Sequence, residues 1–170
     1  YTISNYVASP GQYNGLFGYN TGTIRNLNVS NFDLTIKTSS NSGAIYVGGI
    51  AGYNAGIIQK CTATAGNINM TLNNVRQGGL ITGENTGTIE NCLTTGAVYI
   101  TQTGENRNNA YASGIAANNI GIINNCITNI SAYAYAYHSG AYGVNGEAGG
   151  ITAVNGSGGE IKNCVVFGQI

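Results

Sequence analysis

The chain has few side chains that could take part in acid–base chemistry: six carboxylates and one histidine, His138, in 170 residues. The carboxylates are Asp33, Glu84, Glu90, Glu105, Glu147 and Glu160. Glycoside hydrolysis needs two converging carboxylates, and calcium binding needs several oxygen ligands on one face. Glu84 and Glu90 flank one turn, but the equivalent positions of the repeat described below are neutral or basic. This pattern favours solvated turn residues over a paired-carboxylate site.

A serine- or cysteine-based triad would depend on His138, because there is no other histidine. His138 ends a run of alternating tyrosine and alanine and precedes a Ser-Gly pair, which is typical of a loop. We therefore expect no catalytic residue, no enzymatic activity and no cofactor.

The four cysteines could form two disulfides or a metal site. They are Cys61, Cys92, Cys126 and Cys164. A zinc site fits poorly, since the chain has no C-x-x-C pair and a single histidine. The cysteines share one position of the repeat, where stacked strands would hold their Cβ atoms roughly 4.8 Å apart, more than a disulfide prefers. We expect buried free thiols that pack as small hydrophobes, with no metal.

The composition argues against several classes of partner. The formal net charge is zero, and the six lysines and arginines are scattered, so no basic stripe could follow a phosphate backbone. No apolar run approaches the roughly 20 residues that span a bilayer. We expect neither nucleic-acid binding nor membrane insertion. The chain begins without methionine, so we expect a processed product or an excised fragment.

The most informative feature of the sequence is an internal repeat. Similar turns occur as "GYNTGTIRNL" from Gly18, "GYNAGIIQKC" from Gly52, "GENTGTIENC" from Gly83 and "ANNIGIINNC" from Ala117, with a looser copy from Ala153. The asparagine of each turn lies at position 20, 54, 85, 119 or 155, so the separations are 34, 31, 34 and 36 residues. A period of this length with small slippage is typical of a solenoid.

The repeating element is predicted to be a β-strand. Frequent glycine, asparagine and β-branched residues oppose helix, and alternating patterns such as "DLTIK" favour strands. The sequence therefore predicts an all-β fold, a parallel β-helix or β-solenoid of about five rungs with roughly 34 residues and three short strands each. Strands are expected at residues 48–52 and their equivalents, after the Asn-Gly turn, and in a variable third segment.

Stacking would place equivalent residues of successive rungs in columns. One column is expected to be an asparagine ladder, whose amides bond from rung to rung and to the backbone of the turn. Its members are Asn20, Asn54, Asn85, Asn119 and Asn155. Glycines two residues later are expected to supply the positive φ of the turn. They are Gly22, Gly56, Gly87 and Gly121.

Two further columns are expected on the outside. One is polar and is interrupted by Lys60, which suggests exposure; its members are Asn26, Lys60, Asn91, Asn125 and Asn163. The other lies three residues before a strand glycine and has the mixed character of a solvated face; its members are Gln12, Tyr46, Arg76, Tyr111 and Glu147.

The repeat resembles the GLUG motif, named for its Gly-Leu-any-Gly core, in segments such as "GLFGYNTGTIRN" from Gly15 and "GGIAGYNAGIIQKC" from Gly48. The resemblance covers five units. It implies one domain over residues 1–170, with a partial rung at 1–14 and five GLUG-like repeats at 15–170. GLUG repeats occur in large secreted and surface-bound bacterial proteins, including adhesin-like chains. The resemblance thus implies an extracellular or cell-surface location and a stalk or adhesive role, and it brings no catalytic residues.

The stretch "AYAYAYH" lies outside the repeated turn. In a strand, Tyr133, Tyr135 and Tyr137 would share one face and the alanines the other. An outward strip of tyrosines, with Tyr99 on the neighbouring rung, would suit binding to a glycan or to a host or cell-surface protein. The alternative is that the tyrosines pack under the next loop or against another copy of the chain.

These observations predict a non-enzymatic structural or adhesive β-solenoid module of a bacterial surface or secreted protein. Two alternatives remain open. The chain ends carry no recognisable polar cap, so copies could stack end to end into an extracellular filament, unless the natural protein continues beyond them. The same architecture also occurs in carbohydrate-binding and carbohydrate-active proteins, which would require converging carboxylates.

Overall fold

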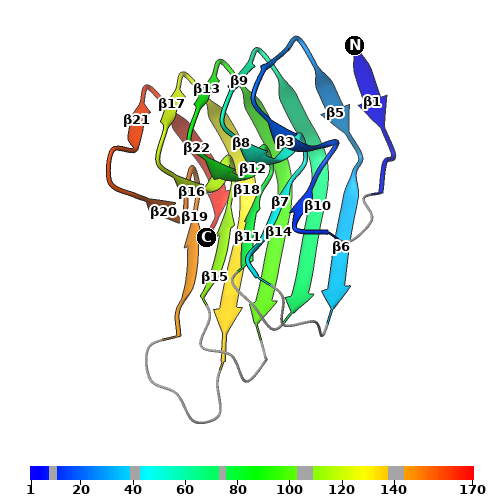
Figure 1. The fold of residues 1–170 in the computed structure, drawn as a ribbon, viewed down its shortest axis with the longest axis vertical. Helices are drawn as coiled ribbons and strands as arrows, with labels where there is room; N and C mark the ends of the chain where they lie inside the picture. Colours follow the sequence, from blue (N-terminus) through cyan, green and yellow to red (C-terminus); the bar gives the residue numbers. More distant parts are fainter. Residues whose placement is uncertain (8–10, 39–42, 73–75, 103–108, 138–143) are drawn as a thin grey trace.

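The computed structural model describes residues 1–7, 11–38, 43–72, 76–102, 109–137 and 144–170. These residues form β-strands joined by short turns, and every strand pairing is parallel. The chain winds through four sheets in turn, so each sheet is built from segments far apart in sequence (Figure 1). The fold class predicted from the repeat, an all-β parallel β-solenoid, is confirmed.

Sheet A carries the longest strands and forms the broad layer of long arrows in Figure 1. Its order is β1-β5-β10-β14-β18-β22, with β6 also pairing with β10. The strands are β1 (Thr2–Ser4), β5 (Asn28–Ser30), β6 (Asp33–Thr38), β10 (Thr62–Leu72), β14 (Leu93–Gln102), β18 (Ile127–Ala136) and β22 (Val165–Gln169).

Sheets B, C and D are made of shorter strands, five in each. Sheet B contains β2 (Tyr13–Asn14), β7 (Ile45–Gly48), β11 (Arg76–Gly79), β15 (Ala110–Ser113) and β19 (Gly146–Gly149). Sheet C contains β3 (Phe17–Asn20), β8 (Ala51–Asn54), β12 (Thr82–Asn85), β16 (Ala116–Asn119) and β20 (Val154–Asn155). Sheet D contains β4 (Thr23–Arg25), β9 (Ile57–Gln59), β13 (Thr88–Glu90), β17 (Ile122–Asn124) and β21 (Glu160–Lys162).

Each turn of the solenoid contains four strand segments, so the prediction of three was wrong. Residues 48–52, expected as one strand, are divided by a bend at 49–50 between β7 and β8. The segment after the asparagine turn is likewise divided at Asn91 between β13 and β14. The five stacked strands of sheets B to D are separated by four steps, which gives about four turns of roughly 34 residues for the five repeat units.

The corner between sheets D and A is made by residues in the left-handed region. Asn26, Lys60, Asn91, Asn125 and Asn163 have φ of 51–53°. Asparagine tolerates this conformation better than other non-glycine residues, which explains the column and makes Lys60 its strained member. The predicted polar column that contains Lys60 therefore forms the corner of the backbone between sheets D and A.

The glycines after the asparagine ladder have a different role from the one expected. Gly22, Gly56, Gly87 and Gly121 are not among the described residues with positive φ, so that prediction was wrong. Instead, a methyl group on Gly87 would collide with the carbonyl oxygen of Gly56, and one on Gly121 with that of Gly87. These glycines let the backbones of successive rungs approach closely.

The core fills the space enclosed by the four sheets. Inward positions repeat from rung to rung, as at Ile58, Ile89 and Ile123, which are fully buried. In sheet A, Ile68 and Val98 are paired in register and are both fully buried. Each rung thus buries its apolar side chains against the rungs beside it, which is how a solenoid is stabilised.

Candidate functional site

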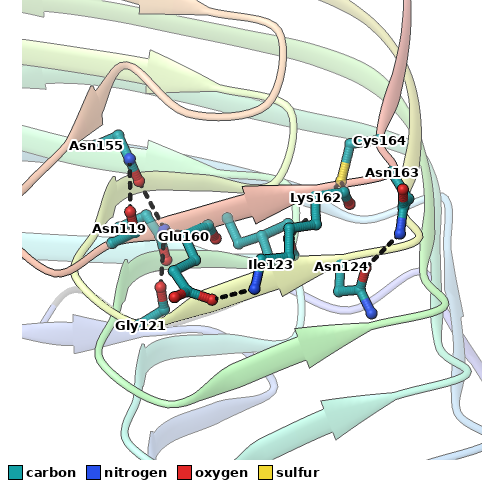
Figure 2. A network of polar contacts seen from close by, with 10 residues as sticks. Asn119, Gly121, Ile123, Asn124, Asn155, Glu160, Lys162, Asn163 and Cys164 are labelled. Atoms are coloured by element: carbon teal, nitrogen blue, oxygen red, sulfur yellow. Dashed lines mark hydrogen bonds and ion pairs between the residues drawn. The ribbon is translucent and has the colours of Figure 1, made fainter.

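The turn asparagines form a continuous chain of hydrogen bonds along the solenoid. The Nδ2 atom of each donates to Oδ1 of the next, at 2.7 Å from Asn20 to Asn54 and 2.8 Å at the three later steps. The same Nδ2 atoms lie 3.1–3.3 Å from carbonyl oxygens two residues later, as at Asn119 and Gly121 in Figure 2. Asn54, Asn85 and Asn119 are fully buried. Their polar atoms are used within the protein, so the ladder is structural.

The cysteine column faces the core. Cys61, Cys92 and Cys126 are buried, Cys164 is half-buried, and all four are free thiols. Each Sγ donates to the carbonyl oxygen two residues earlier, at 3.1–3.2 Å. Hydrogen bonding to Cys126 and Cys61, together with burial, raises the pKa of the Cys92 thiol. A raised pKa keeps the thiol protonated and unreactive.

The described carboxylates are spread over all four sheets, with Asp33 on β6 of sheet A. Glu84 lies on β12 of sheet C, Glu147 on β19 of sheet B, and Glu90 and Glu160 on β13 and β21 of sheet D. Glu160 forms an exposed ion pair of 2.6 Å with Lys162. Among the described residues, no three histidine, cysteine, aspartate or glutamate side chains are grouped so that they could hold a metal ion. His138 lies outside the described residues.

Tyr133 and Tyr135 point outward from β18, and Tyr137 follows the strand, with its backbone N–H donating to the Gln102 carbonyl at 2.9 Å. On the opposite face, Ala132 is buried, and Ala134 and Ala136 pack against the core. The alternation in "AYAYAY" thus directs alanine inward and tyrosine outward, because successive side chains of a strand point to opposite faces.

Tyr99 of β14 is the register partner of Tyr133 and lies on the same outer face. We call Tyr99, Tyr133, Tyr135 and Tyr137 the tyrosine strip. Their side chains keep 43–52% of their surface exposed, and no ring of the strip contacts another aromatic ring of the described residues. The ring faces of the strip are therefore not used for packing against one another.

A second group of tyrosines was missed in the sequence. Tyr19 and Tyr53 stack with ring centroids 4.7 Å apart, and Tyr13 and Tyr46 stack at 5.4 Å. Edge contacts, such as Tyr46 to Tyr53 at 5.8 Å, join the two stacks across the bend between sheets B and C. These four rings use their faces on one another, so the group is a packing feature. Tyrosines spaced six or seven residues apart in the first two repeats were the signal that could have revealed it.

The pairing of the sheet B strands also corrects the second outer column predicted from the sequence, the one of mixed character. The structure aligns Tyr13, Tyr46, Gln77, Tyr111 and Glu147, so Gln12 and Arg76 are wrong members. The register is set by pairing of Gly48 with Gly79, which places the column two residues before these glycines.

Arg76 occupies an inward position, aligned with Ile45 and Ala110. Its side chain is fully buried, and its three guanidinium nitrogens have no hydrogen-bond partner within the described part of the chain. Desolvation by burial lowers the pKa of Arg76 to about 9.

The model of the GLUG motif matches residues 43–69, from the residues just before β7 into β10. The chain contains a GLUG motif. The four other units pair in register with this GLUG segment or with its neighbours, so they are further copies of the same structural unit. No curated protein and no solved structure matches the chain. No helix of the described residues is long and apolar enough to cross a membrane.

Proposed function

We propose that this GLUG-containing solenoid is a non-enzymatic structural and adhesive module of a bacterial surface or secreted protein. The observation that carries the proposal is the tyrosine strip, because its exposed rings stand on a broad parallel sheet and contact no other aromatic ring among the described residues. Flat, rigid and amphipathic rings of this kind suit adhesion to glycans or to a partner protein.

The body that carries the strip is suited to a structural role. Hydrogen bonds of the buried asparagine ladder link every rung to the next, and the glycines beside it allow close backbone contact. Such a scaffold holds the backbone of sheet A in place, so little backbone freedom is lost when a partner binds.

The location is proposed from the GLUG motif at residues 43–69, because the resemblance to GLUG repeats implies a secreted or surface-bound bacterial protein. The spread of the described carboxylates over four sheets supports a binding module better than a carbohydrate-active enzyme, which would need two of them to converge.

Adhesion can be tested with beads under flow. We expect beads coated with the native chain to stay attached to cultured epithelial cells at shear rates that remove albumin-coated beads. The matched control is the same chain carboxymethylated at its cysteines in denaturant, which we expect not to refold, because the buried column has no partner for added carboxylates within the described part of the chain. Equal detachment of native, carboxymethylated and albumin beads would overturn the adhesive role.

A further inference from the structure

The outer face of sheet A around the tyrosine strip has the chemistry of a carbohydrate-binding surface, and we propose that it binds a neutral polysaccharide lying across β14 and β18. This inference rests on the adhesive function proposed above and names the ligand class. Its central residues are Tyr99, Tyr133 and Tyr135.

The arrangement of the three rings follows from the pairing of the strands. Tyr99 and Tyr133 are register partners on neighbouring strands, which are about 4.8 Å apart. Tyr133 and Tyr135 are two residues apart on one strand, and their backbone positions are therefore about 6.6 Å apart. The rings form a triangle on one face, so more than one sugar residue can be contacted at once.

Polar side chains surround the rings. Thr101 is the register partner of Tyr135, and Ser131 lies two residues before Tyr133 on the same face. On the next strand, Asn69 is paired with Tyr99 and is exposed. Sugar rings present C–H groups on their faces and hydroxyls at their edges, so they match aromatic rings bordered by hydroxyl and amide groups.

The absence of charge on these strands selects the class of polysaccharide. The outward residues 67, 69 and 71 of β10, 97, 99 and 101 of β14, and 131, 133 and 135 of β18 are all uncharged. Among the described strands of sheet A, the next charged side chains on the same face are Asp33 and Lys37 of β6, beyond β10. An acidic polysaccharide would find no complementary cation on the described residues of β10, β14 and β18, whereas a neutral one needs none.

The surface continues beyond the rings, which favours an extended ligand. Ile127 of β18 pairs with Leu93 of β14 and Val165 of β22, and these three side chains are 38–45% exposed. Phe167 pairs with Asn129 and is 58% exposed. The stacked tyrosines of sheets B and C do not offer such a surface, because their ring faces contact one another.

Affinity electrophoresis tests the inference. Native gels contain hydroxyethyl cellulose, mixed-linkage β-glucan or galactomannan as neutral polysaccharides, and polygalacturonate as the acidic one. We expect the migration of the full chain to be retarded by at least one neutral polysaccharide and not by polygalacturonate. No retardation by any neutral polysaccharide, or retardation by polygalacturonate alone, would overturn the inference.

Two variants locate the site. The double variant Tyr133→Leu, Tyr135→Leu keeps apolar area but removes the rings, and we expect it to weaken the retardation about tenfold. The matched control is Tyr19→Leu, since Tyr19 is 50% exposed but lies on sheet C. Equal melting midpoints would show that both variants fold; if the double variant does not, Tyr99→Leu takes its place with the same expectation. Unchanged retardation in a folded strip variant, or an equal loss in Tyr19→Leu, would overturn the assignment.

The bead assay and the gel assay distinguish a failure of the proposed adhesive role from a failure of the polysaccharide inference. If the beads attach to cells but no neutral polysaccharide retards the chain in gels, the adhesive role is retained and the polysaccharide inference is overturned. This result would point to a protein partner. Retardation in gels without bead attachment would support the polysaccharide site and overturn adhesion to cells.

Discussion

Asn85 donates a hydrogen bond from Nδ2 to Oδ1 of Asn119 at 2.8 Å, and its own Oδ1 accepts one from Asn54 at the same distance. Both contacts are buried, and each partner lies one turn of the solenoid away, 34 or 31 residues along the chain. Replacement of Asn85 therefore interrupts the ladder at its centre.

We expect Asn85→Leu to lower the free energy of unfolding by about 1–3 kcal/mol, because the Asn54 amide and the Gly87 carbonyl lose a buried partner. Urea unfolding followed by circular dichroism measures the change. Asn69→Leu is the matched control, since Asn69 is exposed on sheet A. A midpoint for Asn85→Leu equal to that of the wild type would contradict a stabilising ladder.

The close approach of glycines gives a second prediction. Gly87→Ala should destabilise the protein by about 1–3 kcal/mol, because the added methyl group meets the backbone of Gly56. Gly22→Ala is the control, because a methyl group added to Gly22 would have no neighbour within 4 Å. If thermal unfolding showed the same loss of stability for both variants, the steric explanation would be contradicted. The loss would then come from a backbone conformation that both glycines need.

Replacement of Lys60 is expected to stabilise the protein rather than destabilise it. It has φ of 52° at a corner where the other four members are asparagine. Lys60→Asn should raise the free energy of unfolding by up to about 1 kcal/mol, since asparagine adopts the left-handed region more readily. The reciprocal change Asn91→Lys should lower it by a similar amount. Denaturant midpoints that move in the same direction for the two variants would be inconsistent with this account.

The burial of the cysteines predicts their reactivity. Under native conditions Ellman's reagent should modify Cys164, which is half-buried, and leave Cys61, Cys92 and Cys126 unmodified. In denaturant all four thiols should react. Rapid modification of more than one thiol in the folded chain would show that the column is open to solvent.

Tyr6 predicts a loss of stability at alkaline pH. Burial raises its pKa above the ordinary value of 10.0, and its hydroxyl donates to the Gly49 carbonyl. The folded state therefore holds this proton more tightly than the unfolded state, so the stabilisation is complete below pH 10 and decreases as the pH rises above it. Urea unfolding of the wild type and Tyr6→Phe at pH 8 and 11 measures the effect. The wild type should lose more stability than the variant, and equal losses would contradict the raised pKa.

The periodic residues determined much of the architecture. The spacing of Asn20, Asn54, Asn85, Asn119 and Asn155 was sufficient to predict stacked rungs, because side chains one turn apart must come together in a solenoid. The alternation from Ala132 to Tyr137 was sufficient to predict that the tyrosines share one face and the alanines the other, because strand geometry alternates whatever its surroundings.

Only the tertiary structure decided how each rung bends and which rings meet. The positive φ at Asn26 and its equivalents, in place of the glycines at the asparagine turn, depends on where the chain passes from sheet D to sheet A. The contact of Tyr46 with Tyr53 and the inward position of Arg76 depend on the register of Gly48 with Gly79. Short spacings in a glycine-rich sequence allow several registers, and a shift of one residue moves every side chain to the opposite face, so the choice is made by packing across the rungs.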